Sequence, residues 1–246
     1  MKILVCISIT PDTTAKISFT NNGTAFNKDG VTFILNPTDE WYALVRALEL
    51  KEKHGGKVTV VHVGEKSSEQ AIRKALAIGA DSAVRINSDA SDAYQIAGEI
   101  AAYAKAENFD VVFTGKEAID YNGFSVGGML AEMLDMPYIS LATSLKMEGN
   151  AATIEREIEG GIETVSVNSP FLLSAQKGMA EQRIPNMRGI MMARRKPLKV
   201  LNPAGITPLT TVKQFELPPE RQDVKLVSPD NVAELARLLH EEAKVF

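Results

Sequence analysis

The chain has 246 residues, of which 45% are hydrophobic and 24% are charged, and its formal net charge is −4. This length and composition suit a globular protein with a substantial core and exclude a disordered, collagen-like or coiled-coil chain. The negative net charge provides no basic surface that would favour nucleic acid. A single cysteine excludes an internal disulfide. Three histidines, widely separated in the sequence, make a metal site a poor fit. We therefore expect no metal and no nucleic-acid partner.

Membrane insertion and export are also poorly supported. No stretch reaches the roughly 20 consecutive apolar residues that span a bilayer. The opening apolar run, Ile3–Ile9, is short, contains Ser8 and lacks a small-residue cleavage site, so it predicts a buried strand instead of a signal peptide. We expect a cytoplasmic protein.

Strand-like and helix-like patterns alternate over residues 1–140. The expected strands cover residues 2–9, 31–35, 57–63, 83–86 and 110–114. The expected helices begin at Thr38 or Asp39, at Ser67 or Ser68, at Asp92 and near Ser125, and they end near His54, Gly79, Glu107 and Leu134. This alternation predicts βαβ units in a mainly parallel sheet, with ligands at the carboxyl ends of the strands.

Two regions depart from this alternation of strands and helices. Residues 9–30 are polar, and Asn22-Gly23 predicts a small hairpin there, which serves either as plain surface or as a surface for a partner. After Pro137 we expect strands at residues 144–147, 152–158, 162–167 and 171–174, joined by turns at 148–150 and 159–161. These strands predict an antiparallel extension of the sheet.

Residues 180–230 hold seven of the eleven prolines and show little periodicity, and Asp230 is expected to cap a final helix. A loop of this length is either disordered or an arm laid on another chain, and its many apolar residues argue against simple disorder. Met187, Met191 and Met192 suit an adaptable contact with another protein, although packing on their own chain fits equally well. The basic run 193–196 is either a solvated patch or a docking surface for an acidic partner.

The segment Gly115–Pro137 carries the strongest signal for a ligand. It leaves a buried strand and enters a helix through Gly123, Gly127 and Gly128, where free N–H groups and the helix dipole suit a phosphate. Glycines at these positions also suit helix–sheet packing alone, and Asp120 suits either a ribose or support of the loop. The P-loop motif and the Rossmann Gly-x-Gly-x-x-Gly motif are both absent.

Other strand ends meet at the same edge of the predicted sheet. Asn36–Asp39 follow one strand and suit a helix cap, Gly64 follows another, and Cys6 ends the first. Together they predict one crevice, although Cys6 and His62 each read best as core residues. No catalytic constellation emerges.

Six parts of the chain resemble one known family. They are KILVCISITPD, LNPTDEWYALVRALELKEKHGG, EQAIRKALAIGAD with VVFTGKEAID, IEREIEGGIETVSVNSPFLLS, and RIPNMRGIMMARRKPL. On these segments the chain resembles the β subunit of electron transfer flavoproteins along nearly its whole length.

The resemblance implies a Rossmann-like three-layer α/β sandwich of the adenine nucleotide α-hydrolase type, with a mainly parallel sheet, an antiparallel extension and an extended C-terminal arm. It implies a nucleotide-binding domain over residues 1–182. Residues 183–246 would form a recognition loop and an arm that wraps the α subunit. The α subunit would hold FAD, and this chain would hold AMP or, as in electron-bifurcating members, a second FAD. Electrons would pass from an acyl-CoA dehydrogenase of fatty acid oxidation, or a similar donor, to a quinone reductase or other acceptor.

Site residues are carried over by position. The residues implied to line the nucleotide are Cys6, Asn36, Pro37, Thr38, Asp39, Val63, Gly64, Gly115, Asp120, Asn122, Gly123, Phe124, Ser125, Val126, Gly127 and Gly128. The residues implied to dock the electron donor are Met187, Arg188, Ile190 and Met191.

The chain departs from the family pattern at several of these places. Ser8 stands where a lysine is common, and Met187 stands where a leucine is common. Phe124-Ser125-Val126-Gly127 replaces the Asn-Gln-Thr-Gly of AMP-binding members, and a valine before the glycine is similar to bifurcating members. AMP and FAD therefore both remain open.

Two other classes of protein are weighed against this one. A stand-alone nucleotide-binding module of the universal stress protein type would be a shorter, compact chain without the arm. An ATP-using ligase of the same superfamily would need a pyrophosphate loop after the first strand, which Ile7–Thr10 does not provide.

Overall fold

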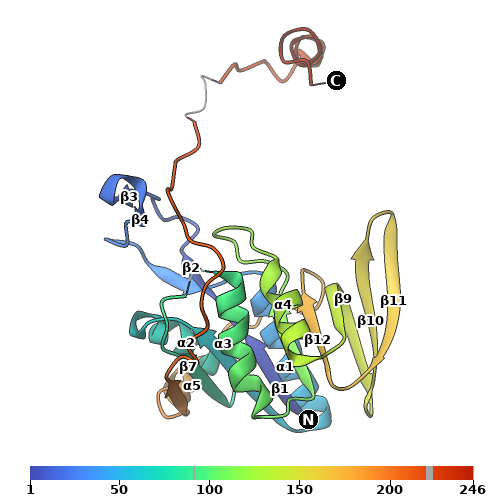
Figure 1. Ribbon diagram of the computed structural model, residues 1–246. Helices are drawn as coiled ribbons and strands as arrows, with labels where there is room; N and C mark the ends of the chain where they lie inside the picture. Colours follow the sequence, from blue (N-terminus) through green and yellow to red (C-terminus); the bar gives the residue numbers. More distant parts are fainter. Residues whose placement is uncertain (91, 220–223, 246) are drawn as a thin grey trace.

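Alternating apolar strands and amphipathic helices build a layered α/β protein, seen in a computed structural model that describes residues 1–90, 92–219 and 224–245 (Figure 1). The central sheet has nine strands in the order β11-β10-β9-β12-β8-β1-β6-β7-β13. These are β1 (Lys2–Cys6), β6 (Lys57–Val63), β7 (Ser82–Ile86), β8 (Val111–Gly115), β9 (Tyr138–Glu148), β10 (Ala151–Ile158), β11 (Gly161–Asn168), β12 (Phe171–Ala175) and β13 (Leu198–Leu201).

The centre of the sheet is parallel, as the alternation predicts. β1 pairs in parallel with β6 on one side and with β8 on the other, and the register sets Val5 beside Val60 and Phe113. The connections are helical: α1 (Asp39–His54), the 3-10 turn η2 (Lys66–Ser68) with α2 (Glu69–Ile78), α3 (Ala93–Lys105) and α4 (Ser125–Leu134). The expected parallel sandwich is therefore confirmed.

Helices cover both faces of the centre of the sheet, which explains why central strands such as β1 and β8 are continuously apolar. Ile3 and Val5 point to the face where α1 and α2 pack. Leu4 and Cys6 point to the other face, which α3 and α4 cover. Figure 1 shows α3 and α4 in front of the sheet and α1 behind it.

The antiparallel extension is present and is longer than predicted. β9 covers Tyr138–Glu148, whereas the expected strand covered only residues 144–147. β9 runs parallel to β12 along its first half and antiparallel to β10 along its second half. The missed first half directly follows Pro137 and carries Ile139 and Ala142 into the core, where pairing with β12 extends the strand.

The N-terminal excursion differs from the expected pattern. The predicted strand at residues 2–9 divides into β1 and β2 (Ile9–Pro11). The predicted strand at 31–35 is the shorter β5 (Phe33–Leu35), which pairs with β2 in a separate two-stranded sheet. The expected hairpin forms from β3 (Phe19–Thr20), the 3-10 turn η1 (Asn21–Gly23) and β4 (Ala25–Phe26).

Two elements in the proline-rich region were not predicted. They are α5 (Met187–Ala193) and β13, which adds a strand beside β7. Both are too short to show a clear period in sequence, and both depend on pairing with distant parts of the chain. The sheet therefore continues beyond residue 182.

After β13 the chain is held against α3 by two carboxylates. Glu99, which is buried, accepts hydrogen bonds from the backbone N–H groups of Ala204, Gly205 and Ile206 at 2.6, 3.1 and 3.1 Å. Asp92 accepts from the N–H and hydroxyl of Thr210 at 3.0 and 2.5 Å. The first part of the arm is thus fixed to its own chain.

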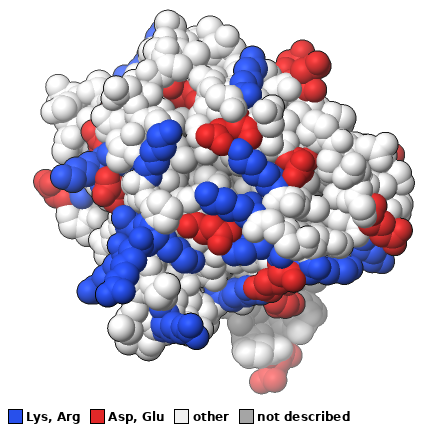
Figure 2. Space-filling view, turned by 90° about the horizontal axis from the view of Figure 1, so that it is seen from below, with Lys and Arg blue, Asp and Glu red and all other residues white. Residues whose placement is uncertain are grey.

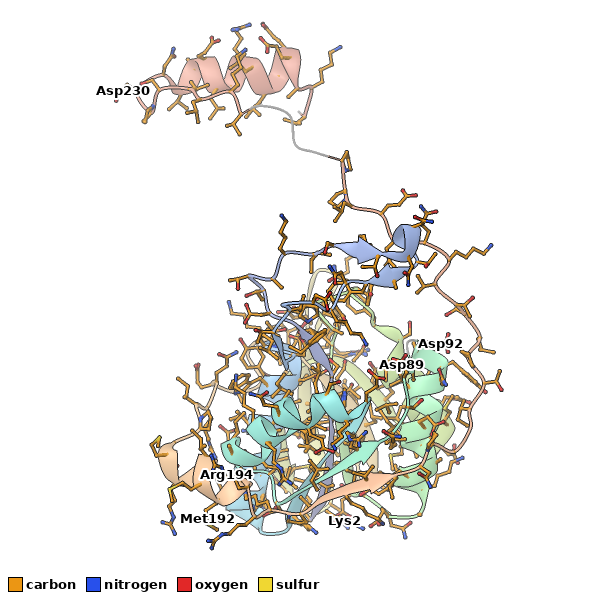
Figure 3. The ribbon with its side chains drawn as sticks, turned by 90° about the vertical axis from the view of Figure 1, so that its left-hand side faces the viewer. Lys2, Asp89, Asp92, Met192, Arg194 and Asp230 are labelled. Atoms are coloured by element: carbon orange, nitrogen blue, oxygen red, sulfur yellow. The ribbon has the colours of Figure 1, made fainter. Side chains whose placement is uncertain are left out.

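The end of the chain forms α6 (Val232–Arg237) and the π-helical turn η3 (Leu238–Glu242), which Figures 1 and 3 show apart from the three layers. The side chain that caps α6 is Asn231, whose Oδ1 accepts from the N–H of Glu234 at 3.2 Å. The expected cap, Asp230, lies one residue earlier. The amide of Asn231 reaches the N3 position that a capping side chain must reach.

We expect the substitution Glu99→Gln to release residues 204–206 from α3. A carboxylate accepts three N–H bonds there, whereas an amide has only one oxygen and presents two donors of its own. Amide hydrogen exchange of residues 204–206 should accelerate roughly ten-fold or more, since bonds to charged acceptors are the stronger kind. Glu132→Gln, at an exposed position on α4, is the matched control. Unchanged exchange in Glu99→Gln would contradict this role of Glu99.

Candidate functional site

The carboxyl edge of the sheet has a topological switch point beside β1. From β1 the chain builds β6 and β7 on one side, and β8 and β12 on the other. The connections after β1 and β8 therefore diverge, and open α/β sheets bind ligands at such a switch point, which we call the crevice. All the residues predicted to line a nucleotide follow strands at this edge or lie in the connections that leave it.

Asn36 joins three of the connections at this crevice. Its N–H donates to the Ser8 carbonyl oxygen at 3.1 Å, and its side-chain Nδ2 donates to the Glu117 carbonyl oxygen at 2.9 Å. Asn36 is fully buried, yet its Oδ1 has no hydrogen-bond partner among the described residues. A buried acceptor of this kind fits a donor group on a ligand, since buried polar atoms are normally paired.

The neighbouring residues of this segment start α1. Thr38 is the N-cap residue, although its side chain makes no capping hydrogen bond. Asp39 is buried, and burial raises the pKa of its carboxyl, while Lys116 and the N–H of Glu117 act in the opposite direction. Pro37 is held by an exposed hydrogen bond, in which its carbonyl oxygen accepts from Gln182 Nε2 at 2.6 Å.

The loop after β8 carries Gly115 to Phe124. It is closed by the Asn122 N–H, which donates to the Ala118 oxygen at 2.9 Å, and Asn122 adopts a left-handed φ of 50°. Asp120 Oδ1 accepts from the Tyr121 N–H at 2.9 Å, and burial raises the pKa of Asp120. The structure thus uses the Asp120 side chain to support the loop, one of its two predicted roles.

The start of α4 offers free donors to this crevice. Its N-cap residue, Phe124, makes no side-chain capping bond, so the N–H groups of the first turn have no side-chain cap. Gly127 is needed for packing, because a Cβ there would lie 2.9 Å from both Thr114 Oγ1 and the Tyr138 hydroxyl. With the free acceptor of Asn36, this helix start fits a nucleotide whose phosphate meets the first turn of α4.

Cys6, Val63 and Gly64 lie at the ends of β1 and β6. The side chains of Cys6 and Val63 are buried in the core below α3 and α4, so only their backbone can face the crevice. Burial raises the pKa of the Cys6 thiol, which keeps it neutral and unreactive. His62 is the core histidine that was expected: its Nδ1 donates to the Ile7 oxygen at 3.0 Å, and burial lowers its pKa to about 4.

Glu40 is a buried residue of the site that the sequence reading missed. Its carboxylate accepts from both the N–H and the hydroxyl of Ser8, the hydroxyl at 2.7 Å, and it lies against Gly115. Burial raises its pKa to about 7, and hydrogen bonds from Ser8 and Asn36 oppose that rise. Among the described residues it forms no salt bridge. The only signal for it in sequence was its place directly after Asn36–Asp39.

The predicted docking residues lie elsewhere, on α5. Met187, Arg188, Ile190 and Met191 are all exposed, and Ala193 is the one buried residue of this helix. α5 packs on α2, near the amino edge of the sheet (Figures 1 and 3). Figure 2 shows basic side chains over this lower face, with acidic ones between them. The structure therefore separates the docking residues from the crevice.

In the part of the chain that is described, no helix is long and apolar enough to cross a membrane. Nor do the described His, Cys, Asp and Glu side chains form a group of three that could hold a metal ion.

A parallel sheet with helices on both faces and a crevice at its switch point defines the Rossmann-like class of α/β proteins. Residues 24–205 match the family described as "Electron transfer flavoprotein domain". The chain is 38% identical over 260 residues to the electron transfer flavoprotein subunit beta of Bacillus subtilis, covering 100% of both chains. It is 33% identical over 231 residues to the human subunit of that name, covering 90% of each. The Caffeyl-CoA reductase-Etf complex subunit CarD of Acetobacterium woodii is 30% identical over 260 residues, covering 99% of this chain and 98% of that one. The chain belongs to the electron transfer flavoprotein family.

This assignment confirms the resemblance drawn from the sequence. It decides against the stress-protein module and the ligase, and it makes the protein a component of an electron transfer flavoprotein. The individual site residues remain predictions that the geometry of the crevice supports.

The raised pKa of Glu40 predicts a pH-dependent stability. Its pKa is about 7 in the folded protein and near 4.5 when unfolded, so the folded state binds the proton more tightly. The stability due to this group is complete below pH 4.5 and is lost as the pH rises to 7. The free energy of unfolding of Glu40→Gln, minus that of the wild type, should rise by about 3 kcal/mol between pH 4.5 and 8.

Chemical denaturation across this pH range measures the difference in the free energy of unfolding. Titration of His62 does not contribute to this difference, because both proteins contain His62. Glu132→Gln at the exposed position on α4 should not reproduce the pH-dependent difference. If the Glu40→Gln difference is the same at all pH values, the pKa of Glu40 is the same in the folded and unfolded protein and the assignment is wrong.

Proposed function

We propose that this chain is the β subunit of a heterodimeric electron transfer flavoprotein whose α subunit holds FAD. The observation that carries the proposal is the similarity to subunits of that name along the entire chain. Electrons would come from a flavin dehydrogenase of the acyl-CoA dehydrogenase type and pass to a quinone reductase or another acceptor. The cytoplasm is the proposed location, in keeping with a lone buried cysteine.

The FAD, when bound, supplies the relay of one or two electrons. The proposed part of this chain is to bind and orient its nucleotide and to shield that nucleotide from solvent. The crevice beside β1 is proposed to hold an adenine nucleotide, either AMP or the adenylate part of a second FAD. Asn36 would accept a hydrogen bond from the ligand, and the first turn of α4 would donate to its phosphate. Phe124 and Val126 offer no polar side chain, which leaves Ser125 and the backbone N–H groups of this turn as the proposed phosphate donors.

We place the boundary between the two functional parts of the chain after residue 182. Residues 1–182 would bind the nucleotide, and residues 183–246 would supply the docking loop and the arm around the α subunit. In the second part β13 completes the sheet, and residues 202–210 are fixed to α3 through Glu99 and Asp92. The segment that remains for the α subunit lies beyond, with exposed apolar side chains such as Leu217, Val224 and Leu226.

The donor is proposed to dock on α5. Met187 and Met191 are 74% and 69% exposed, and such apolar side chains on a surface favour a protein contact. Arg188 lies between them in sequence and suits an acidic rim on the partner. A relative is named as a subunit of a complex with caffeyl-CoA reductase, which supports a partner that acts on CoA thioesters.

Co-expression with the α subunit encoded by the same organism tests the proposed heterodimer and its cofactors. We expect the two chains to co-purify with yellow colour, and the released cofactors can be counted per heterodimer after denaturation. One FAD with one AMP would indicate the simple carrier, and two FAD molecules would indicate a bifurcating type. A colourless monomer that does not bind the α subunit would refute the proposed function.

The substitution Met187→Ala should weaken docking of the donor. Loss of an exposed anchor side chain from a protein interface should raise the KM for the heterodimer roughly ten-fold, with little effect on its FAD content. The measurement is steady-state reduction of the heterodimer by a medium-chain acyl-CoA dehydrogenase and its acyl-CoA. Ile158→Ala, an exposed apolar position at the end of β10, serves as the control. An unchanged KM in Met187→Ala would remove the docking role from this helix.

A further inference from the structure

α5 is poorly anchored by apolar packing. The helix has seven residues, and Ala193 is the only buried one. The large apolar side chains of the helix are exposed. A helix this short is not stable by itself. The orientation of its exposed face must therefore depend on the polar contacts that hold it to the body of the protein.

Those contacts form a reciprocal cap between the C-terminal ends of α2 and α5. Arg73, on α2, donates from Nη1 to the carbonyl oxygens of Ala193 and Lys196 at 2.8 and 2.7 Å. Lys196, just after α5, donates from Nζ to the carbonyl oxygens of Leu76 and Ala80 at 2.8 and 2.6 Å. Each cation thus satisfies carbonyl groups that the other helix end leaves free, where a positive charge is favoured by the helix dipole.

A close backbone approach completes the junction. A Cβ at Gly189 would collide with the carbonyl oxygen of Ala77 on α2, so only glycine permits this contact. The N–H of Gly189 donates to Asn186 Oδ1 at 2.8 Å, which caps the start of α5. The C-terminal end and one side of α5 are therefore fixed to α2, its start is capped by Asn186, and its remaining face is exposed.

We propose that Arg73 and Lys196 are positioning residues for partner docking, which hold the Met187–Met191 face of α5 in the orientation that an electron donor meets. Exposed Arg188, Arg194 and Arg195 accompany this face. The surface therefore fits a partner with an apolar socket bordered by carboxylates. The inference deepens the docking function proposed above and rests on it, but the junction itself can be tested separately.

The first test measures the junction in the heterodimer with its FAD. Arg73→Met keeps the apolar stem and removes both hydrogen bonds, so amide hydrogen exchange over residues 187–193 should accelerate roughly ten-fold. Lys196→Met should have a similar effect, and the double variant should add less than the sum because both act on one junction. Arg156→Met is the matched control, since β10 lies towards the other end of the sheet from β7 and α2. Unchanged exchange over α5 in Arg73→Met would overturn the proposal.

The second test measures docking, with the medium-chain acyl-CoA dehydrogenase as the probe. Arg73→Met should raise the KM for the heterodimer about five- to twenty-fold and leave kcat and FAD content within two-fold, because the groups that hold FAD are not involved. If α5 exchange accelerates and Met187→Ala raises KM but Arg73→Met does not, the positioning role is wrong. If neither variant changes KM, the docking function of α5 fails, and the positioning role fails with it.

Discussion

The structure depends on a polar junction buried at the carboxyl edge of an otherwise apolar sheet. Asn36 and Glu40 connect the segment after β1, the start of α1 and the loop after β8 through hydrogen bonds to Ser8 and Glu117. Buried polar groups of this kind are costly unless they are satisfied, so they select a single arrangement of the three segments. The crevice at the switch point is shaped by that arrangement.

The two ends of the sheet serve different proposed purposes. The carboxyl edge gathers the uncapped N–H groups at the start of α4 and the unpaired amide oxygen of Asn36, which is an environment for a ligand held by main-chain donors and a buried amide. The amino edge presents α5, whose exposed apolar side chains stand among basic residues. If both proposals hold, separation of the two sites would let a partner bind and leave without disturbing the nucleotide. Recognition of the donor would then depend on a short helix of which only Ala193 is buried.

How much could be predicted from sequence differed between the parts of the chain. Strands such as Lys57–Val63 were clear because both faces are buried, and α3 was clear because Asp92 and an apolar stripe mark its start and its inner face. The division of residues 2–9 into β1 and β2 was missed, because Ile7 and Ser8 look like strand residues locally and the break is held at Ser8 by contacts with Asn36 and Glu40, which are distant in sequence. α5 and β13 were missed because Arg73, Lys196 and the edge of β7 define them, and these contacts span more than one segment of the chain. The crevice residues were located by strand ends, whereas Glu40 was missed because its place directly after Asn36–Asp39 does not indicate that an acidic side chain there is buried.

The position of β13 in the sheet has a consequence for how the protein forms. β7 is complete at Ile86, but the strand that covers its edge ends at Leu201, and the cap from Arg73 reaches a carbonyl 120 positions further along the chain. During synthesis the edge of β7 is therefore left open while the residues between Ile86 and Leu201 are made, and an open edge invites pairing with other chains. The contacts between β7 and β13 join residues that are far apart in sequence, and contacts of this kind form slowly during folding. The isolated nascent chain would be prone to aggregate, and a chaperone that shelters this edge until β13 arrives would raise the yield of folded protein.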